Sequence, residues 1–292
     1  MRVELAPDRE LFPFTSRWFE GAGPRVHYVD EGSGPLVVMF HGNPTWSFLY
    51  RKVILGLRDR YRCIALDYPG FGLSERPAGY GYTPGEHAVV AGRLVDEIVE
   101  GPFSVMGQDW GGPIGMTVAL ERPERVRSMV FANTWFWPAT GRFTAFSLVM
   151  STPVLQWLIL RRNFFVERII PSGVRLTKLP DAVMDAYRGP FPTPESRRPA
   201  HVFPREILGS RPFLAEIEKR LPALSDRPAL IVWPTKDVAF REPERRRWEQ
   251  LFGEHRTVML EGAGHYIQED APEEIIAAIR DWSGGQSSQS HH

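Results

Sequence analysis

The sequence predicts an α/β fold, an open and mostly parallel central sheet flanked by helices, with a helical cap inserted after the sixth strand. Three observations support this fold class. Short runs of consecutive apolar residues recur along the chain, helix-like segments separate them, and one long stretch interrupts the alternation. Because the apolar runs are continuous rather than alternating, they indicate strands buried on both faces, as in a parallel sheet covered by helices.

The strand predictions rest on six apolar, β-branched runs. These are LVVMFH (36–41), CIALD (63–67), FSVMG (103–107), RSMVFAN (127–133), ALIVW (229–233) and RTVML (256–260). Helix-like stretches accompany them, among them 85–99 and 272–282. The second opens with proline and two acidic residues, which is typical of a helix N-terminus. Strand–helix alternation with right-handed crossovers gives an open α/β sheet.

The interruption defines the predicted domain organisation. Residues 135–224 show no central-strand pattern, only aromatic and helical segments with many prolines. We predict a core in two parts, residues 1–134 and 225–282, with a cap at 135–224 over the carboxyl edge of the sheet, where open α/β folds place their sites. An independent second domain is the alternative, although no flexible linker flanks the segment. The polar, low-complexity residues 283–292 are predicted to be a disordered tail or tag remnant.

Composition and charge exclude several classes of protein. The 292 residues are 43% hydrophobic and 24% charged, which is typical of a globular chain. Lys+Arg and Asp+Glu both number 35, so no net field attracts nucleic acid or an anionic membrane surface. The longest apolar passage, 146–160, is shorter than the roughly 20 residues of a membrane span. The single cysteine, Cys63, and an N-terminus unlike a signal peptide favour a cytoplasmic location.

The strongest functional signal is the segment FSVMGQDWGGPIGMTVAL at 103–120. A buried strand leads into G-x-D-x-G, with Gly107, Asp109 and Gly111, and a helix of small residues follows at once. This pattern predicts a nucleophile elbow, the strand–turn–helix of α/β-hydrolases in which glycines leave room for a strained residue. Serine is the usual nucleophile there, and here it is aspartate. We therefore predict Asp109 as the nucleophile; the alternative is an aspartate that merely caps a helix.

A base and an acid follow in the order that such a fold requires, nucleophile, then acid, then histidine. Asp237 lies four residues past the strand-like run ALIVW, and His265 follows RTVML in the glycine-rich segment EGAGHYIQED. A nucleophilic enzyme needs a base and a group that orients it. We therefore predict Asp109, Asp237 and His265 as the catalytic triad.

The segment HGNPTW (41–46) supplies the second half of the predicted site. The backbone N–H groups of Asn43 and Trp110 could form an oxyanion hole. The side chains of these two residues also carry N–H donors, which could hold a departing halide ion. The alternative is that Trp110 only packs and Asn43 only shapes a turn. No metal-ligand spacing or phosphate loop is present, so we predict no metal and no cofactor.

These motifs resemble those of the haloalkane dehalogenases. HGNPTWS, DYPGFGLSERP and GQDWGG are similar to that family's oxyanion-loop, turn and nucleophile motifs, and the resemblance extends over roughly residues 12–282. It implies Asp109 as nucleophile, His265 as base and Asn43 with Trp110 as the halide-binding pair. Some members carry a catalytic Glu after the sixth strand, where this chain has Asn133. The acid is then Asp237, as in the family's third subfamily.

The resemblance implies that a small haloalkane and water are converted into an alcohol, a halide ion and a proton. An epoxide hydrolase is the nearest alternative, but such enzymes use two cap tyrosines and this cap contains only Tyr187. A catalytically silent α/β-hydrolase that acts as a ligand receptor is the alternative from another class. The surplus of apolar cap residues could also mediate self-association into a homo-oligomer.

Overall fold

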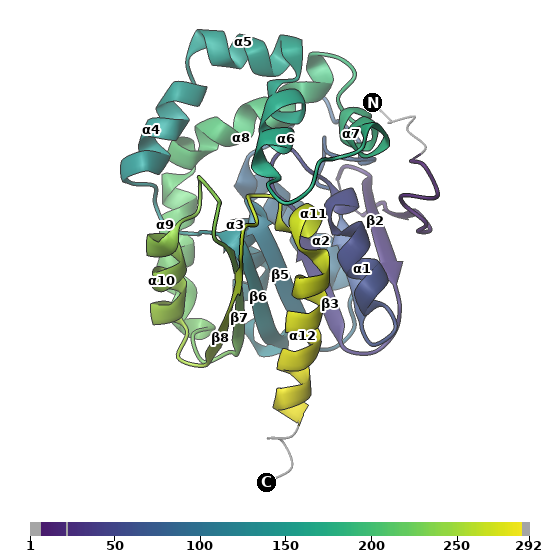
Figure 1. The fold of residues 1–292 in the computed structure, drawn as a ribbon, viewed down its shortest axis with the longest axis vertical. Coiled ribbons are helices and arrows are strands. Elements are labelled where there is room, and N and C mark those ends of the chain that lie inside the picture. The colour runs from purple at the N-terminus through teal and green to yellow at the C-terminus, as the bar shows by residue number, and fades with distance from the viewer. Residues whose placement is uncertain (1–6, 22, 288–292) are drawn as a thin grey trace.

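The computed structural model describes residues 7–21 and 23–287, and it contains an eight-stranded sheet between layers of helices (Figure 1). The strand order is β1-β2-β4-β3-β5-β6-β7-β8, and β2 runs antiparallel to both of its neighbours while the others pair in parallel. The mostly parallel sheet is therefore confirmed. The strands are β1 (Arg17–Phe19), β2 (Val26–Glu31), β3 (Leu36–Phe40), β4 (Arg62–Leu66), β5 (Phe103–Asp109), β6 (Val126–Thr134), β7 (Ala229–Pro234) and β8 (His255–Leu260).

The six predicted apolar runs become β3 to β8, each within two residues of the expected bounds. All five residues of β3 are buried, and Val38 pairs with Ile64 on one side and Val105 on the other. Continuous burial of this kind explains why these strands could be recognised. The antiparallel edge formed by β1 and β2 was not among the predicted strands, because β1 has only three residues and β2 ends in two charged ones.

Helices cover both faces of the sheet (Figure 1). α1 and α12 pack against each other on the face toward the viewer, and α2 and α3 pack against each other on the opposite face. The start of α2 follows from a capping box, in which Thr83 and Glu86 satisfy each other's backbone N–H groups. The core helices are η1 (Ser47–Tyr50), α1 (Arg51–Leu57), α2 (Pro84–Ile98), α3 (Gly111–Leu120), η2 (Pro123–Arg125), α10 (Glu242–Leu251), α11 (Ile267–Asp270) and α12 (Pro272–Ser287).

The segment between β6 and β7 is helical, and most of it lies over the carboxyl edge of the sheet (Figure 1). Its last α-helix, α9, instead packs against α3 beside the sheet, with Leu214 and Ile217 buried. α9 therefore lies beside the sheet and not over its carboxyl edge. The helices of the segment are α4 (Gly141–Met150), α5 (Pro153–Arg162), η3 (Phe165–Ile169), α6 (Ile170–Gly173), α7 (Asp181–Arg188), η4 (Glu195–Arg197), α8 (Arg198–Gly209), α9 (Arg211–Arg220) and η5 (Leu221–Ala223).

The C-terminal end differs from the expectation of a disordered stretch over 283–292. Helix α12 continues to Ser287, and the rest of that stretch lies outside the described residues. Propagation through two glycines costs only about 1 kcal/mol each relative to alanine, so an established helix can extend past Trp282.

No single helix within residues 7–21 and 23–287 has the length and hydropathy to cross a bilayer. Only α4 and α5 taken together, bent by 66° at their junction, would pass on these two criteria.

Candidate active site

The predicted elbow is present at the junction of β5 and α3. Asp109 ends the strand with a φ of 51°, a left-handed conformation that costs a non-glycine residue roughly 1–3 kcal/mol. Thr134 holds the strained turn by donating its hydroxyl to the Asp109 carbonyl at 2.5 Å. A side chain at Gly111 would overlap the Phe40 carbonyl, so glycine is required where the helix begins. The local sequence thus fixes the position of the Asp109 carboxylate.

One oxygen of the Asp109 carboxylate lies in a cradle of backbone donors. The Asn43 N–H donates to Oδ1 at 2.9 Å, and the Trp110 N–H also faces the carboxylate and lowers its pKa. A side chain at Gly42 would overlap the carboxylate itself, so the oxyanion loop can approach this closely only with glycine there. Burial raises the pKa of Asp109 above its ordinary value, although His265 and the two N–H groups favour the charged form.

His265 and Asp237 stand on the other side of the nucleophile. His265 Nδ1 lies 3.0 Å from Asp237 Oδ2, and Nε2 lies 3.8 Å from Asp109 Oδ2. The backbone N–H of Ala239 donates to Asp237 Oδ1 at 2.7 Å, which fixes the acid on its loop. The three predicted triad residues are therefore brought together, in the order nucleophile, base, acid.

Electrostatics favour an imidazolium that the acid stabilises. Burial opposes charge on His265, but the nearby Asp237 and Asp109 carboxylates outweigh it and raise the pKa of the imidazole. Burial likewise opposes ionisation of Asp237, yet His265, Asn133 and the Ala239 N–H lower the pKa of that carboxyl. The opposite directions of these two pKa shifts are those expected of an acid that orients a base.

Asn133 donates hydrogen bonds to two of the predicted triad residues, contacts that we did not predict. It occupies the end of β6 with a φ of 29°, and its Nδ2 donates to Asp237 Oδ2 at 2.8 Å and to the His265 carbonyl at 2.7 Å. Gln108 adds a bond to the same carbonyl at 3.2 Å. The position of Asn133 near the carboxyl end of a predicted strand is the sequence signal that points to this site.

The side chains proposed to hold a halide carry free donors. Trp110 is 2% exposed. Its ring packs edge-on against Trp135, with 4.6 Å between ring centroids, and at a tilt against Phe203, with 5.3 Å between centroids. Within the described part of the chain, neither the Trp110 indole N–H nor the Asn43 side-chain amide N–H donates a hydrogen bond to a protein acceptor, and the Asn43 side-chain oxygen is buried without a donor. Aromatic rings continue from Trp135 to Phe240, which stacks on His265 at 5.7 Å. The walls near the nucleophile are therefore apolar, with a few N–H donors, a combination suited to a small apolar ligand.

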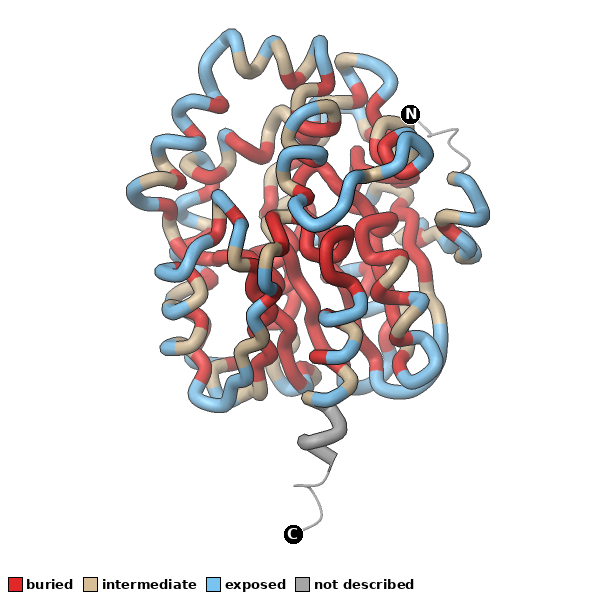
Figure 2. Tube along the Cα trace, in the orientation of Figure 1, coloured by how far each residue is buried: buried red, intermediate tan, exposed pale blue. Residues whose placement is uncertain are grey.

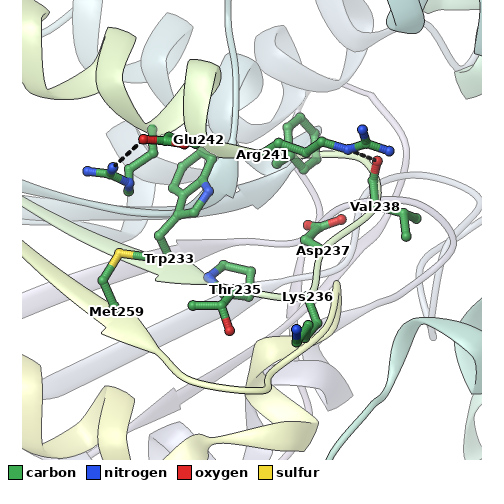
Figure 3. A pocket seen from close by; sticks show the side chains of 11 residues that line it. Trp233, Thr235, Lys236, Asp237, Val238, Arg241, Glu242 and Met259 are labelled. Carbon is green, nitrogen blue, oxygen red and sulfur yellow. Dashed lines mark hydrogen bonds and ion pairs between the residues drawn. The ribbon is translucent and has the colours of Figure 1, made fainter.

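A surface cavity of about 490 Å³ lies behind the loop that carries the acid (Figure 3). Figure 3 shows Asp237 and Val238 on one wall and Trp233 with Met259 on the other. Neither Asp109 nor His265 lines this cavity, nor a second one of about 440 Å³ next to Arg188. The aromatic-walled region around Asp109 and His265 is therefore distinct from both of these cavities.

Comparisons with known proteins agree with this geometry. Residues 35–272 match the family model described as the alpha/beta hydrolase fold. The chain is 53% identical to haloalkane dehalogenase 2 of Mycobacterium tuberculosis over 282 residues, 96% of this chain and 98% of that protein. It is 33% identical to a cis-3-alkyl-4-alkyloxetan-2-one decarboxylase of Shewanella oneidensis, over 92% of this chain and 88% of the relative.

A solved structure is similar over nearly the whole chain. The haloalkane dehalogenase of Bradyrhizobium elkani superposes with a TM-score of 0.85 at 28% identity, over 94% of this chain and 99% of that one. The identity to a dehalogenase exceeds that to the decarboxylase by a wide margin over similar lengths. The chain therefore belongs to the α/β-hydrolase superfamily and, within it, to the haloalkane dehalogenases.

Proposed function

We propose that this chain cleaves carbon–halogen bonds of small haloalkanes through a covalent ester on Asp109. The observation that carries the proposal is the arrangement of that carboxylate, with Oδ1 held by the Asn43 N–H at 2.9 Å and Oδ2 facing His265. Oδ2 attacks the halogen-bearing carbon, the carbon–halogen bond breaks, and the halide leaves with the bonding electron pair. An ionised carboxylate needs no base for this step.

Water completes the reaction in a second step. His265 Nε2 accepts a proton from a water molecule as the water attacks the carbonyl carbon of the ester. The N–H groups of Asn43 and Trp110 stabilise the resulting oxyanion, and loss of one such donor typically costs on the order of 10²–10³ in rate. The tetrahedral intermediate then collapses, and the alkoxide takes the proton from His265 and leaves as the alcohol. The new carboxyl group releases its remaining proton to solvent, which restores the carboxylate. No cofactor or metal takes part in this scheme.

The proposal is tested by bromide release from a panel of short bromoalkanes. We expect stoichiometric bromide and alcohol from at least one member, because the walls near Asp109 are apolar. Matched epoxides form the second arm of the panel. Diol formation from epoxides without any bromide release would instead support the epoxide hydrolase.

The epoxide hydrolase is disfavoured by the surroundings of the one cap tyrosine. Tyr187 is buried, and its hydroxyl donates to Glu269 Oε1 at 2.7 Å, so the proton that would be offered to an epoxide oxygen is already engaged. Burial also raises the pKa of Tyr187 well above its ordinary value. A ligand receptor without turnover would bind bromoalkanes and release no bromide.

The proposed halide-binding role of Trp110 predicts a defined loss. Trp110→Phe keeps an apolar ring and removes the N–H, so the first-turnover rate of bromide release should fall by about 10- to 100-fold, the value of one charge-assisted hydrogen bond. Trp135→Phe is the matched control, because it removes the N–H of a neighbouring indole that is buried and without a partner among the described residues. Equal rates in Trp110→Phe and wild type, measured by rapid quench, would remove Trp110 from the halide site.

The two steps should respond differently to acid. Alkylation requires ionised Asp109. It therefore continues as the pH falls until the pH approaches the pKa of Asp109, which burial raises above the ordinary 3.8. Hydrolysis requires neutral His265, whose pKa is raised above 6.5, so turnover falls as the pH drops through that higher value. At a pH where Asp109 is ionised and His265 is protonated, a first-turnover bromide burst should survive while steady-state release declines. Identical acid limbs for burst and steady state would contradict this assignment.

We further propose that a second copy of the chain covers the exposed apolar face of α4 and α5. Figure 2 shows the outer sides of these helices exposed. The large apolar side chains there are Phe146, Leu148, Val149, Val154 and Trp157. Light scattering should then give a mass above the 33.3 kDa of one chain, and a mass of one chain at all concentrations would exclude this.

A cytoplasmic location remains our proposal, on the ground of the single buried Cys63.

A further inference from the structure

Two acidic residues that we did not single out from the sequence are buried directly after the base. Glu269 and Asp270 belong to α11, the four-residue helix that begins two positions after His265, and they are 1% and 7% exposed. Buried carboxylates require partners, since an uncompensated buried charge costs several kcal/mol. Their partners show what holds the loop of His265 in place.

Asp270 binds three backbone N–H groups from two separate segments. Its Oδ2 accepts from Gly264 at 2.7 Å, in the loop of the base. Its carboxylate also accepts from Arg175 at 2.9 Å and from Leu176 at 2.8 Å, in the segment that follows the covering helix α6. One carboxylate therefore ties the residue before His265 to the helical segment above the sheet.

The same two segments are also joined by the backbone. The His265 N–H donates to the Gly173 carbonyl at 2.7 Å, and a side chain on Gly264 would overlap that carbonyl. The two backbones therefore pack closely, with no room for a side chain at position 264. Since the His265 backbone itself is one partner, its position depends on residues 173–176.

Glu269 anchors the other side of α11. It accepts from Arg51 Nη2 at 2.9 Å and from the Tyr187 hydroxyl at 2.7 Å. Arg51 belongs to core helix α1 and Tyr187 to α7 of the covering segment. With both acids engaged, α11 is fixed against the core and the covering helices, and only Asp270 reaches the loop of the base directly.

We infer that Asp270 is a positioning residue for the hydrolytic half of the reaction, an inference that rests on the proposed two-step function. Asp270 touches no reacting atom, but it sets the backbone from which His265 Nε2 reaches toward Asp109. A displacement of about 1 Å in a catalytic group can cost on the order of 10²-fold in rate. Alkylation uses only Asp109 and the halide donors, so loss of Asp270 slows the second step and leaves the first intact.

Asp270→Asn tests the inference, because the amide has the carboxylate's size but one acceptor oxygen fewer and no charge. We expect first-turnover bromide release within about 2-fold of wild type, steady-state turnover lower by about 10- to 100-fold, and an alkyl adduct on Asp109 in the intact mass. Asp30→Asn is the matched control. Asp30 makes two hydrogen bonds, both to Arg62, and lies on β2, which is separated from β5 by β4 and β3, so its loss should lower the unfolding temperature without adduct accumulation.

The outcomes separate the inference from the proposed function. Adduct accumulation in Asp270→Asn but not in Asp30→Asn supports the positioning role. Equal slowing of burst and steady state, or wild-type turnover without adduct, overturns it. If circular dichroism shows Asp270→Asn unfolded, Asp270→Glu keeps the charge and displaces the acceptors, and the same adduct is expected at a lower level. Absence of bromide release from wild type would instead refute the proposed function itself.

Discussion

Replacing Asp109 with asparagine is expected to abolish bromide release while leaving the fold intact. The amide is a far weaker nucleophile than the carboxylate, and the reaction has no other acceptor for the alkyl group. Loss of the nucleophile in a covalent mechanism typically costs on the order of 10⁴–10⁶ in turnover. The strained φ of 51° and the Asn43 N–H contact to Oδ1 both tolerate an asparagine, so the unfolding temperature should stay close to that of wild type.

The measurement is steady-state bromide release in Asp109→Asn and in Asp109→Ala, beside the remote control Asp30→Asn. Asparagine retains an oxygen at Oδ1 that accepts the Asn43 N–H, whereas alanine leaves this donor without an acceptor. Comparison of the two variants therefore separates loss of the nucleophile from a change in the structure of the strand–turn–helix. Both variants should be inactive, and the control should turn over normally. Activity of either Asp109 variant within about 100-fold of wild type would show that another group attacks the carbon.

Replacing His265 with glutamine should block hydrolysis of the ester but not alkylation of Asp109. The first bromide is released because alkylation needs no base, but water is no longer activated. General-base catalysis contributes typically 10²–10⁴-fold, so steady-state turnover should fall by about that factor. The alkyl ester should then persist, and the intact mass of the protein should rise by one alkyl group located on the peptide that contains Asp109.

Phe240→Leu serves as the control for loss of packing around the base. Phe240 stacks on His265 at 5.7 Å without sharing its proton, so its loss should affect turnover less and should not trap the ester to the same extent. Full turnover by His265→Gln, or an adduct on another residue, would contradict the assignment of the base.

The parts of the fold that could be predicted are those whose local sequence carries a strong pattern. Val38 and Val105 lie in strands buried on both faces, and a continuous apolar run follows directly from that burial. The antiparallel strand β2, which contains His27, lacks such a run. The placement of α9 depends on contact with α3, roughly a hundred residues earlier in the chain, and nothing local in its sequence specifies it.

The site could be predicted in part for the same reason. Asp109 sits in a local strand–turn–helix pattern, and Asp237 and His265 follow strands in a fixed order. Asn133 and Asp270 act through backbone groups that belong to distant segments, which leave no mark on the surrounding sequence. Their roles became visible only when the structure placed those segments together.

The route of a single oxygen atom tests the central claim most directly. Enzyme in excess over a bromoalkane turns over once in water labelled with oxygen-18. Mass spectrometry then measures the oxygen-18 content of the alcohol and of the peptide that contains Asp109. If water attacks the carbonyl carbon of an ester, the alcohol keeps the unlabelled Asp109 oxygen and the label appears in the peptide. Label in the alcohol and none in the peptide would mean that water attacks the substrate carbon directly, and the ester on Asp109 would be ruled out.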